Sequence, residues 1–385
     1  MSQYDFIIAG GGAAGLSLAY HLLHSPLRDR SLLVVDKDAK ERNDRTFAFW
    51  ADRPTPFDDV VYRSWNQLRF AGDSLEKVIP LGDFRYQMIR SIDYYQFVRG
   101  DLSTHPNVKL LQGRVDRIDD GDEGARVWVE DQAYSGQWVF DSRFSLPNSR
   151  PEPNRHHHLC QHFKGWVVET PGRAFDPQIA TFLDFRTPQK NEMRFFYVLP
   201  FSERQALVEF VLFSPDDCNQ ALKDYLADTL GITEYRVVAR EGGINPLTDA
   251  PFPRKLGRRI MAIGTLGGMV KPSSGYAFTR IQADSAAMVR SLLQKGHPFD
   301  VPASPRFYRT CDALMLHVMA RHGAQIKPIF SAMFRNNPIE RIFRFLDEAT
   351  SLWENLVMMA SLPPRLFVQA WFELKILGRV HQPIG

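Results

Sequence analysis

The stretch FIIAGGGAAGLSLAYHL, which runs from Phe6 to Leu22, decides the fold of this 385-residue chain. Its apolar beginning predicts a buried strand, and its glycines predict a tight turn that leads into a helix. Gly10, Gly12 and Gly15 follow the G-x-G-x-x-G spacing. In this pattern the first glycine permits the turn, the second lets the backbone approach a pyrophosphate at the helix N-terminus, and the third packs the helix against the strand. The stretch therefore predicts a dinucleotide-binding site.

A second apolar run supports this prediction. Residues 32–35 read LLVV and are followed by Asp36, about twenty residues beyond Gly15, where the carboxylate that binds a ribose hydroxyl belongs. We therefore expect Asp36 to lie beside the bound nucleotide.

The composition limits the class of protein. Hydrophobic residues make up 44% of the chain, enough to bury large cores in two or three packed subdomains. The formal net charge of +3 is too small to favour nucleic-acid binding. Cys160, Cys218 and Cys311 are far apart and lack metal-ligand spacing. We therefore expect a reducing, cytosolic-side environment rather than a disulfide framework.

The order of the predicted elements divides the chain into five parts. Short aromatic and β-branched runs near 163–169, 179–185, 194–199 and 205–213, with a further strand near 235–240, predict an antiparallel sheet. The five parts are 1–80, nucleotide-binding and Rossmann-like; 81–150, a crossover helix from about Ser91 and a small sheet; 151–250, the inserted sheet; 251–300, a return to the nucleotide-binding part; and 301–385, a helical region.

The helical region at 301–385 admits two interpretations. It mixes basic residues with Trp353, Phe367, Trp371 and Phe372, a combination typical of helices that lie at a membrane interface. A lid that packs on the sheet explains the same residues equally well. The chain has no run of the ~20 apolar residues that cross a bilayer, and the first strand begins too early for a signal peptide, so we expect at most peripheral membrane association.

Five further motifs, in order along the chain, narrow the family. They are NDRTFAFW at 43–50, YQMIRSIDYYQFV at 86–98, LPFSERQALVEF at 199–210, GGINPLTD at 242–249 and GTLGGMVKPSSGY at 264–276. Together with the glycine turn they resemble the lycopene cyclase family over essentially the whole chain. The resemblance implies an α/β fold with an α+β insert: the FAD-binding Rossmann-like fold of the glutathione reductase and aromatic hydroxylase class, an inserted antiparallel β-sheet and a helical C-terminal region.

The resemblance also implies an activity. A lycopene β-cyclase closes β-ionone rings at the acyclic ψ ends of lycopene, giving γ- or β-carotene, in a reaction that an acid initiates without net oxidation or reduction. The implied cofactor is FAD in its reduced form, with NAD(P)H as the reductant. The implied enzyme is an isomerase that takes lycopene or a related acyclic carotenoid, peripherally associated with the cytoplasmic side of a membrane.

Glu209 is the predicted catalytic acid. It lies in an otherwise apolar strand, ALVEFV at 206–211, where burial disfavours the charged carboxylate and preserves a proton for donation. The family pattern has Glu at this place, often followed by a second acid, but here the next residue is Phe210. This departure speaks against a relay between adjacent carboxylates. The alternative is a strand Glu that faces solvent, because alternation alone does not settle its face.

Arg45 and two late glycines complete the predicted cofactor site. Arg45, in the NDRT loop beside Asp44, is predicted to contact flavin or ribose, the alternative being a surface salt bridge. Gly267 and Gly268 are predicted to bring backbone amides close to a phosphate or to the flavin carbonyls.

Two other polar groups receive different interpretations. Asp249 is either a second active-site carboxylate or a turn cap, and we favour the cap. His156, His157 and His158 are consecutive, so they do not converge on a metal without special geometry. We expect a solvated polar loop there and no metal site.

Other functions fit parts of the pattern. An FAD-dependent monooxygenase or prenyl reductase acting on an apolar isoprenoid would consume NAD(P)H with each turnover, whereas a carotenoid carrier would leave the polyene intact. The late loop opens with Gly264-Thr265, where many flavin hydroxylases have Gly-Asp, which weakens the hydroxylase interpretation.

Overall fold

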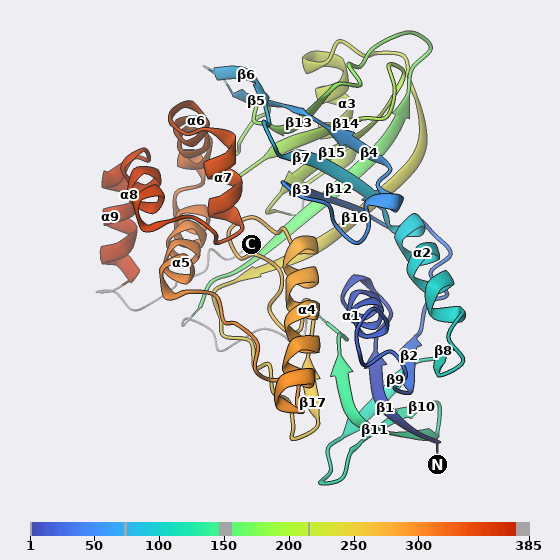
Figure 1. The fold of residues 1–385 in the computed structure, drawn as a ribbon. Helices are drawn as coiled ribbons and strands as arrows, with labels where there is room; N and C mark the ends of the chain where they lie inside the picture. The colour runs from blue at the N-terminus through green and yellow to red at the C-terminus, as the bar shows by residue number, and fades with distance from the viewer. Residues whose placement is uncertain (1, 73–74, 146–155, 215, 375–385) are drawn as a thin grey trace.

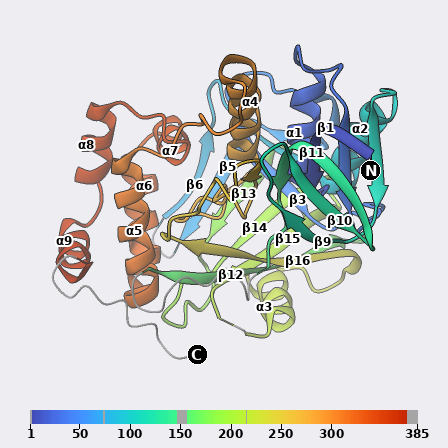
Figure 2. The ribbon, with the colours of Figure 1, turned by 90° about the horizontal axis from the view of Figure 1, so that it is seen from below.

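The computed structural model describes residues 2–72, 75–145, 156–214 and 216–374, and it has the predicted α/β architecture. The nucleotide-binding sheet and a second, mostly antiparallel sheet form separate layers (Figures 1 and 2). Both have seven strands, but those of the second contain more residues, and it is here called the larger sheet. In both figures, helices from the C-terminal region lie beside it.

The nucleotide-binding sheet has the strand order β8-β2-β1-β11-β10-β9, with β17 paired to β11. Its strands are β1 (Ser2–Ala9), β2 (Leu32–Asp36), β8 (Val108–Gln112), β9 (Val115–Asp119), β10 (Ala125–Val129), β11 (Gln132–Asp141) and β17 (Ile260–Ala262). Helices α1 (Ala13–Leu23), α2 (Ser91–Ser103) and α4 (Phe278–Lys295) share one apolar core with it. Because β1 and β2 are parallel neighbours, the glycine turn and Asp36 lie together at their carboxyl ends, where such sheets bind nucleotides.

The larger sheet has the order β16-β12-β15-β14-β13-β5-β6. Its strands are β5 (Gln67–Gly72), β6 (Leu75–Pro80), β12 (His158–Glu169), β13 (Ile179–Asp184), β14 (Phe195–Pro200), β15 (Gln205–Leu212) and β16 (Arg236–Thr248). The sheet extends beyond the insert expected at 151–250. Strands β5 and β6 come from residues before 151, and they join the sheet because β5 pairs in parallel with β13. Strand β16 is also longer than the strand expected at 235–240. A three-stranded sheet, β3-β7-β4, completes the strands: β3 (Thr46–Ala51), β4 (Arg63–Trp65) and β7 (Arg85–Arg90).

Alternation along β15 gives the larger sheet two different faces. Val208 and Phe210 pack on one side with the short helix α3 (Cys218–Asp224) and the π-helical turn Tyr225–Thr229. Leu207 and Val211 point to the opposite side and belong to the largest core cluster. Since side chains alternate between faces in a strand, Glu209 shares the side of Leu207 and Val211.

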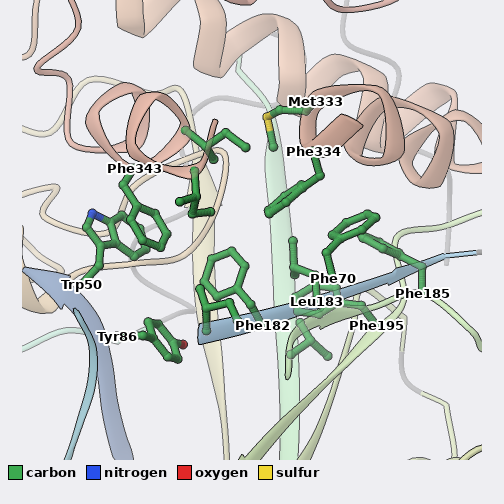
Figure 3. Packing of buried hydrophobic residues seen from close by; sticks show 14 of the residues in the cluster. Trp50, Phe70, Tyr86, Phe182, Leu183, Phe185, Phe195, Met333, Phe334 and Phe343 are labelled. Atoms are coloured by element: carbon green, nitrogen blue, oxygen red, sulfur yellow. The ribbon is translucent and has the colours of Figure 1, made fainter. Parts of the chain in front are cut away.

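The C-terminal helices form a lid over part of that second face. They are α5 (Arg306–Arg321), α6 (Ile326–Asn336), α7 (Ile339–Leu346), α8 (Leu352–Ala360) and α9 (Pro364–Phe372). A 3₁₀ turn at 323–325 lies between α5 and α6, and another, at 58–60, lies outside the lid. Phe334 stacks on Phe70 with ring centroids 4.3 Å apart, and Phe343 stacks on Trp50 at 4.6 Å (Figure 3). The inner sides of these helices are thus core, as expected for a packed lid. Among the described helices, none has both the length and the apolar character needed to span a membrane.

Candidate active site

A cavity of about 1100 Å³ runs from the glycine turn of β1 and α1 to the uncovered part of the larger sheet. Gly10 and Gly12 line one end, and Tyr86, Glu209 and Glu241 line the other. The nucleotide-binding sheet and the larger sheet therefore contribute to a single site, so a cofactor and a substrate bound in it would be neighbours.

The three glycines of the turn differ in the space around them: one faces open space, and the other two are closely packed. A Cβ added at Gly12 would meet nothing within 4 Å. At Gly15 it would lie 1.9 Å from the carbonyl oxygen of Gly10, and Gly10 itself has φ +108°, a conformation that favours glycine. The N-terminus of α1 has no side-chain cap, so its first backbone N–H groups are free to bind a phosphate. This cradle fits a dinucleotide pyrophosphate.

Asp36 and Arg45 also line the cavity. Asp36 accepts hydrogen bonds from the backbone N–H of Gly11 at 2.5 Å and of Asp38 at 2.7 Å, which hold its carboxylate beside the turn. The half-exposed Arg45 guanidinium lies 3.6 Å from the Asp44 carboxylate. Arg45 thus lines the cavity and also forms an ion pair, and its contact with flavin or ribose stays a prediction.

The late glycine loop contributes different residues from those predicted. Gly264 and Thr265 line the cavity, whereas Gly267 and Gly268 are not among the described residues that do so. A Cβ at Gly267 would lie 2.7 Å from the carbonyl oxygen of Ala262. One at Gly268, where φ is +77°, would lie 2.8 Å from the Phe252 ring. These two glycines fold the loop tightly, and their direct contact with a cofactor stays a prediction.

Glu209 lies in a row of residues that crosses three adjacent strands. Gly165 of β12 pairs with Glu209 of β15 on one side and with Glu241 of β16 on the other. Glycine has no side chain, so the two glutamates meet above it. A Cβ at Gly165 would lie 3.0 Å from Glu241 Cγ and 3.4 Å from Glu209 Oε2.

The two carboxyl groups perturb each other. Burial raises the pKa of Glu209 well above its ordinary value, and the charge of Glu241 and a hydrogen bond to Glu241 raise it further. Burial also raises the pKa of Glu241, although the hydrogen bonds from Glu209 and Thr46 and the charge of Arg45 oppose that shift. Glu209 therefore holds a proton at pH values where an ordinary glutamate has lost it.

Three tyrosines form a connected group beside Glu209. Tyr197 of β14 pairs with Glu209 in the sheet, and its hydroxyl lies 3.1 Å from that of Tyr276, which is 3.4 Å from the hydroxyl of Tyr86. Burial raises the pKa of each of these hydroxyls, so all three stay neutral. Apolar neighbours such as Leu207 make the rest of this end hydrophobic.

Asp249 and the three histidines lie elsewhere. Asp249 accepts hydrogen bonds from the backbone N–H of His157 at 2.7 Å and from its Nδ1 at 3.0 Å. It therefore binds a segment distant in the sequence, which differs from the expected cap of its own turn. The expectation of a solvated loop is wrong for His157, which is 1% exposed. Its Nε2 lies 3.1 Å from His317 Nδ1, and His317 Nε2 lies 2.6 Å from Glu373 Oε2. Packing of α5 against the larger sheet, at β16, buries His157.

Both Glu209 and Glu241 line the cavity, and sequence reasoning singles out Glu209 but misses Glu241. The position after Glu209 is Phe210. A second acid is nevertheless present, because Glu241 comes from β16, two strands away in the sheet. Its one local signal is the Glu-Gly-Gly run at 241–243, where a charged residue precedes a motif of the family. The strand expected from local pattern ends at 240, so that pattern assigns the side chain of Glu241 to neither face.

Solved structures share the fold at low sequence identity. A flavoprotein/dehydrogenase from Cytophaga hutchinsonii has a TM-score of 0.66 and 12% identity, covering 97% of this chain and 100% of its own. A geranylgeranyl bacteriochlorophyll reductase-like protein from Thermoplasma acidophilum has a TM-score of 0.63 and 10% identity, covering 96% and 98%. These similarities show that the chain has the fold of these proteins.

Curated plant proteins share recognisable sequence. A chloroplastic lycopene beta cyclase of Arabidopsis thaliana is 23% identical over 316 residues, covering 75% of this chain and 60% of its own length. A chloroplastic neoxanthin synthase of Solanum tuberosum is 22% identical over 327 residues, covering 76% and 61%. The match thus spans about 60% of the length of these relatives. Residues 5–371 also match the sequence model of the lycopene cyclase protein family, and the chain therefore belongs to the lycopene cyclase family.

Proposed function

We propose that the chain is a lycopene β-cyclase, which converts the acyclic ψ ends of lycopene to β-ionone rings. One observation carries the proposal: the carboxyl group of Glu209 faces a cavity that also contains the dinucleotide cradle, and its environment keeps it protonated. A hydrocarbon offers an enzyme no polar group to hold, so the site must combine an apolar surface with a placed acid. This end of the cavity has both.

The residues at this end suit an acid-initiated ring closure. Glu209 donates its proton to the terminal double bond, a C–H bond forms, and a tertiary cation results. The neighbouring internal double bond attacks the cation and closes the ring, and loss of a ring proton leaves the new double bond. The electron-rich faces of Tyr86, Tyr197 and Tyr276 attract a cation, and the surrounding apolar side chains exclude water that would trap it.

The cavity fits FAD as the cofactor. Gly12 and the uncapped N-terminus of α1 would hold the pyrophosphate, and Asp36 would bind a ribose hydroxyl. Reduced FAD would supply an electron-rich group that stabilises positive charge or takes part in proton transfer, while NAD(P)H serves only to keep it reduced. The ring closure itself is an isomerisation.

We further propose that the lid rests on the cytoplasmic side of a membrane, where the substrate is dissolved. Helices α8 and α9 lie on the outer side of the lid (Figures 1 and 2). They carry a group of exposed apolar residues, here called the lid patch. The lid patch consists of Leu352, Trp353 and Leu356 on α8 and Val368, Trp371 and Phe372 on α9. Apart from Asp347, the exposed charged residues at 306–374 are all arginines, which suits an anionic lipid surface.

The test is a cyclisation assay without oxygen. Purified protein, FAD, a reductant and lycopene-loaded vesicles should give a ring-closed product of unchanged mass, analysed by chromatography and mass spectrometry. Glu209→Gln should lower the rate by about 100- to 10,000-fold, the usual contribution of a general acid, while FAD stays bound. A product whose mass has changed by oxygen or hydrogen would instead support the monooxygenase or the prenyl reductase, and recovery of unchanged lycopene alone would support a carrier.

A further inference from the structure

We propose that Glu241 shares a single proton with Glu209 and holds it on Glu209, which makes Glu241 a positioning residue for the acid. The inference rests on the function proposed above, which uses Glu209 as the proton donor. It assigns a role to a residue of β16 that the family motifs leave out.

The two carboxyl groups meet across a strand position that has no side chain. Glu209 and Glu241 lie on strands that do not pair with each other, because β12 runs between them. A side chain on the intervening residue would separate them, but that residue is Gly165. The position therefore requires glycine for the carboxyl groups to touch, although its φ is not in the left-handed region.

The hydrogen bonds of Glu241 leave one oxygen that needs a donor. Its Oε2 accepts from the hydroxyl of Thr46 at 2.9 Å. Its Oε1 is buried and has no donor among the described residues unless a carboxyl group supplies one. Ionised carboxylates only accept hydrogen bonds, so a proton on Glu209 is the donor that the arrangement lacks. A buried oxygen without such a donor is unfavourable.

The charges around the pair favour one proton rather than none or two. Two buried carboxylates in contact repel each other, so both cannot ionise freely. The Arg45 guanidinium and the Thr46 hydroxyl stabilise a negative charge on Glu241, whereas Asp44 opposes it. Around Glu209 the neighbouring groups are the neutral hydroxyls of Tyr86 and Tyr197. The single negative charge therefore belongs on Glu241 and the proton on Glu209.

A shared proton also balances the reaction. Glu209 gives its proton to the polyene, so the pair briefly carries two negative charges beside one carbocation. When the ring proton leaves, its C–H electron pair becomes the ring double bond and the proton returns to the pair. One proton leaves and one returns per ring, and no oxidant or reductant is consumed.

The experiment is an infrared titration of the carboxyl groups in purified protein without carotenoid. In the wild type, the Glu209 proton should persist well above the range of an ordinary glutamate. The difference spectrum against Glu209→Gln isolates this signal from those of Asp284 and Asp347, whose pKa values burial also raises. Glu241→Gln removes the negative charge, so the Glu209 proton should be lost about one to two pH units lower. Gly165→Ala keeps both acids but separates them, and it should shift the midpoint in the same direction.

Matched controls separate this effect from general disturbance of the strands. Glu169→Gln removes an acid from β12 that pairs with Arg236 at the surface, and Gly172→Ala adds a Cβ in open space. Neither should move the midpoint. The inference is overturned if Glu241→Gln or Gly165→Ala folds, as judged by circular dichroism, with an unshifted Glu209 midpoint. A shifted midpoint without any cyclisation would refute the proposed function and leave the shared proton standing.

Discussion

Gly10, Gly12 and Gly15 look alike in the sequence, yet an added side chain would act differently at each. Gly12 has ordinary backbone angles and open space before it, so Gly12→Val should fold normally and lose FAD. Gly10 has a positive φ, and a Cβ added there would lie only 2.2 Å from Ser142 Oγ, so Gly10→Val should also lower stability. Flavin absorbance per protein and thermal unfolding measure the two effects.

A matched control for the flavin prediction is Gly172→Val, since that glycine also faces open space but on the surface. It should retain FAD. Retention of FAD by Gly12→Val would contradict the assigned cradle.

Glu209 should also make stability depend on pH. Its pKa is higher in the folded chain than in the unfolded chain, so its proton favours folding at low pH and that contribution is lost as pH rises. The loss begins near the ordinary glutamate pKa of about 4.3 and continues up to the folded value. Glu209→Gln should therefore be more stable than the wild type at alkaline pH, with the difference growing as pH rises. Urea unfolding across the pH range measures this, and parallel curves for the two proteins would contradict the raised pKa.

Between secondary-structure elements, a chain of buried polar groups connects the lid to the larger sheet. Asp249 and His157 lie at the edge of that sheet, His317 lies on α5, and Glu373 follows α9. His317→Leu would leave His157 and Glu373 without their hydrogen bonds to His317. The free energy of unfolding should fall by about 1–3 kcal/mol. We expect urea unfolding to show this loss and limited proteolysis to cut the lid faster. His105→Leu, in the distant nucleotide-binding part, is the control and should have less effect.

The same chain of polar groups gives a second pH dependence of opposite sign. Burial lowers the pKa of His317, and the nearby His157 lowers it further, although Glu373 opposes both. The unfolded chain therefore binds this proton more readily, and stability falls as pH drops below about 6.5, the ordinary histidine value. The His317→Leu variant should lack this part of the pH dependence.

Strands β15 and β16 show how far elements can be predicted. Strand β15 is expected at 205–213 and is found at Gln205–Leu212, because an apolar run bounded by polar turns is a strong local signal. Strand β16 is expected only at 235–240, since Gly242, Gly243 and Pro246 are poor strand residues. Pairing along β12 extends it to Thr248. The backbone hydrogen bonds to the partner strand therefore outweigh the low strand propensity of these residues.

Across the whole molecule, the lid patch predicts membrane binding. Leu352 and Trp353 are 85% and 72% exposed, so replacing both with Ser should hardly change folding stability. Each buried apolar side chain contributes about 1.5–3 kcal/mol, so vesicle affinity should fall at least about tenfold. Cosedimentation with anionic vesicles measures the loss, and raised salt should weaken wild-type binding because the exposed arginines contribute.

The control for the lid patch is Leu256→Ser, which removes an exposed leucine beside β17 in the nucleotide-binding part. Its vesicle binding should match the wild type. Equal vesicle binding by the lid variant and the wild type would place the membrane contact elsewhere.

Local sequence is enough to predict the strand, glycine turn and helix at the N-terminus, the family, and the strand that carries Glu209, because each depends on short runs of neighbouring residues. Only tertiary packing selects the face that Glu209 occupies, buries His157 between the sheet and the lid, and puts Gly264 and Thr265 rather than Gly267 and Gly268 on the cavity wall. It also brings Glu241 to Glu209 across Gly165. The cause is that register between strands far apart in sequence depends on the packing of the whole sheet, and no local pattern encodes it.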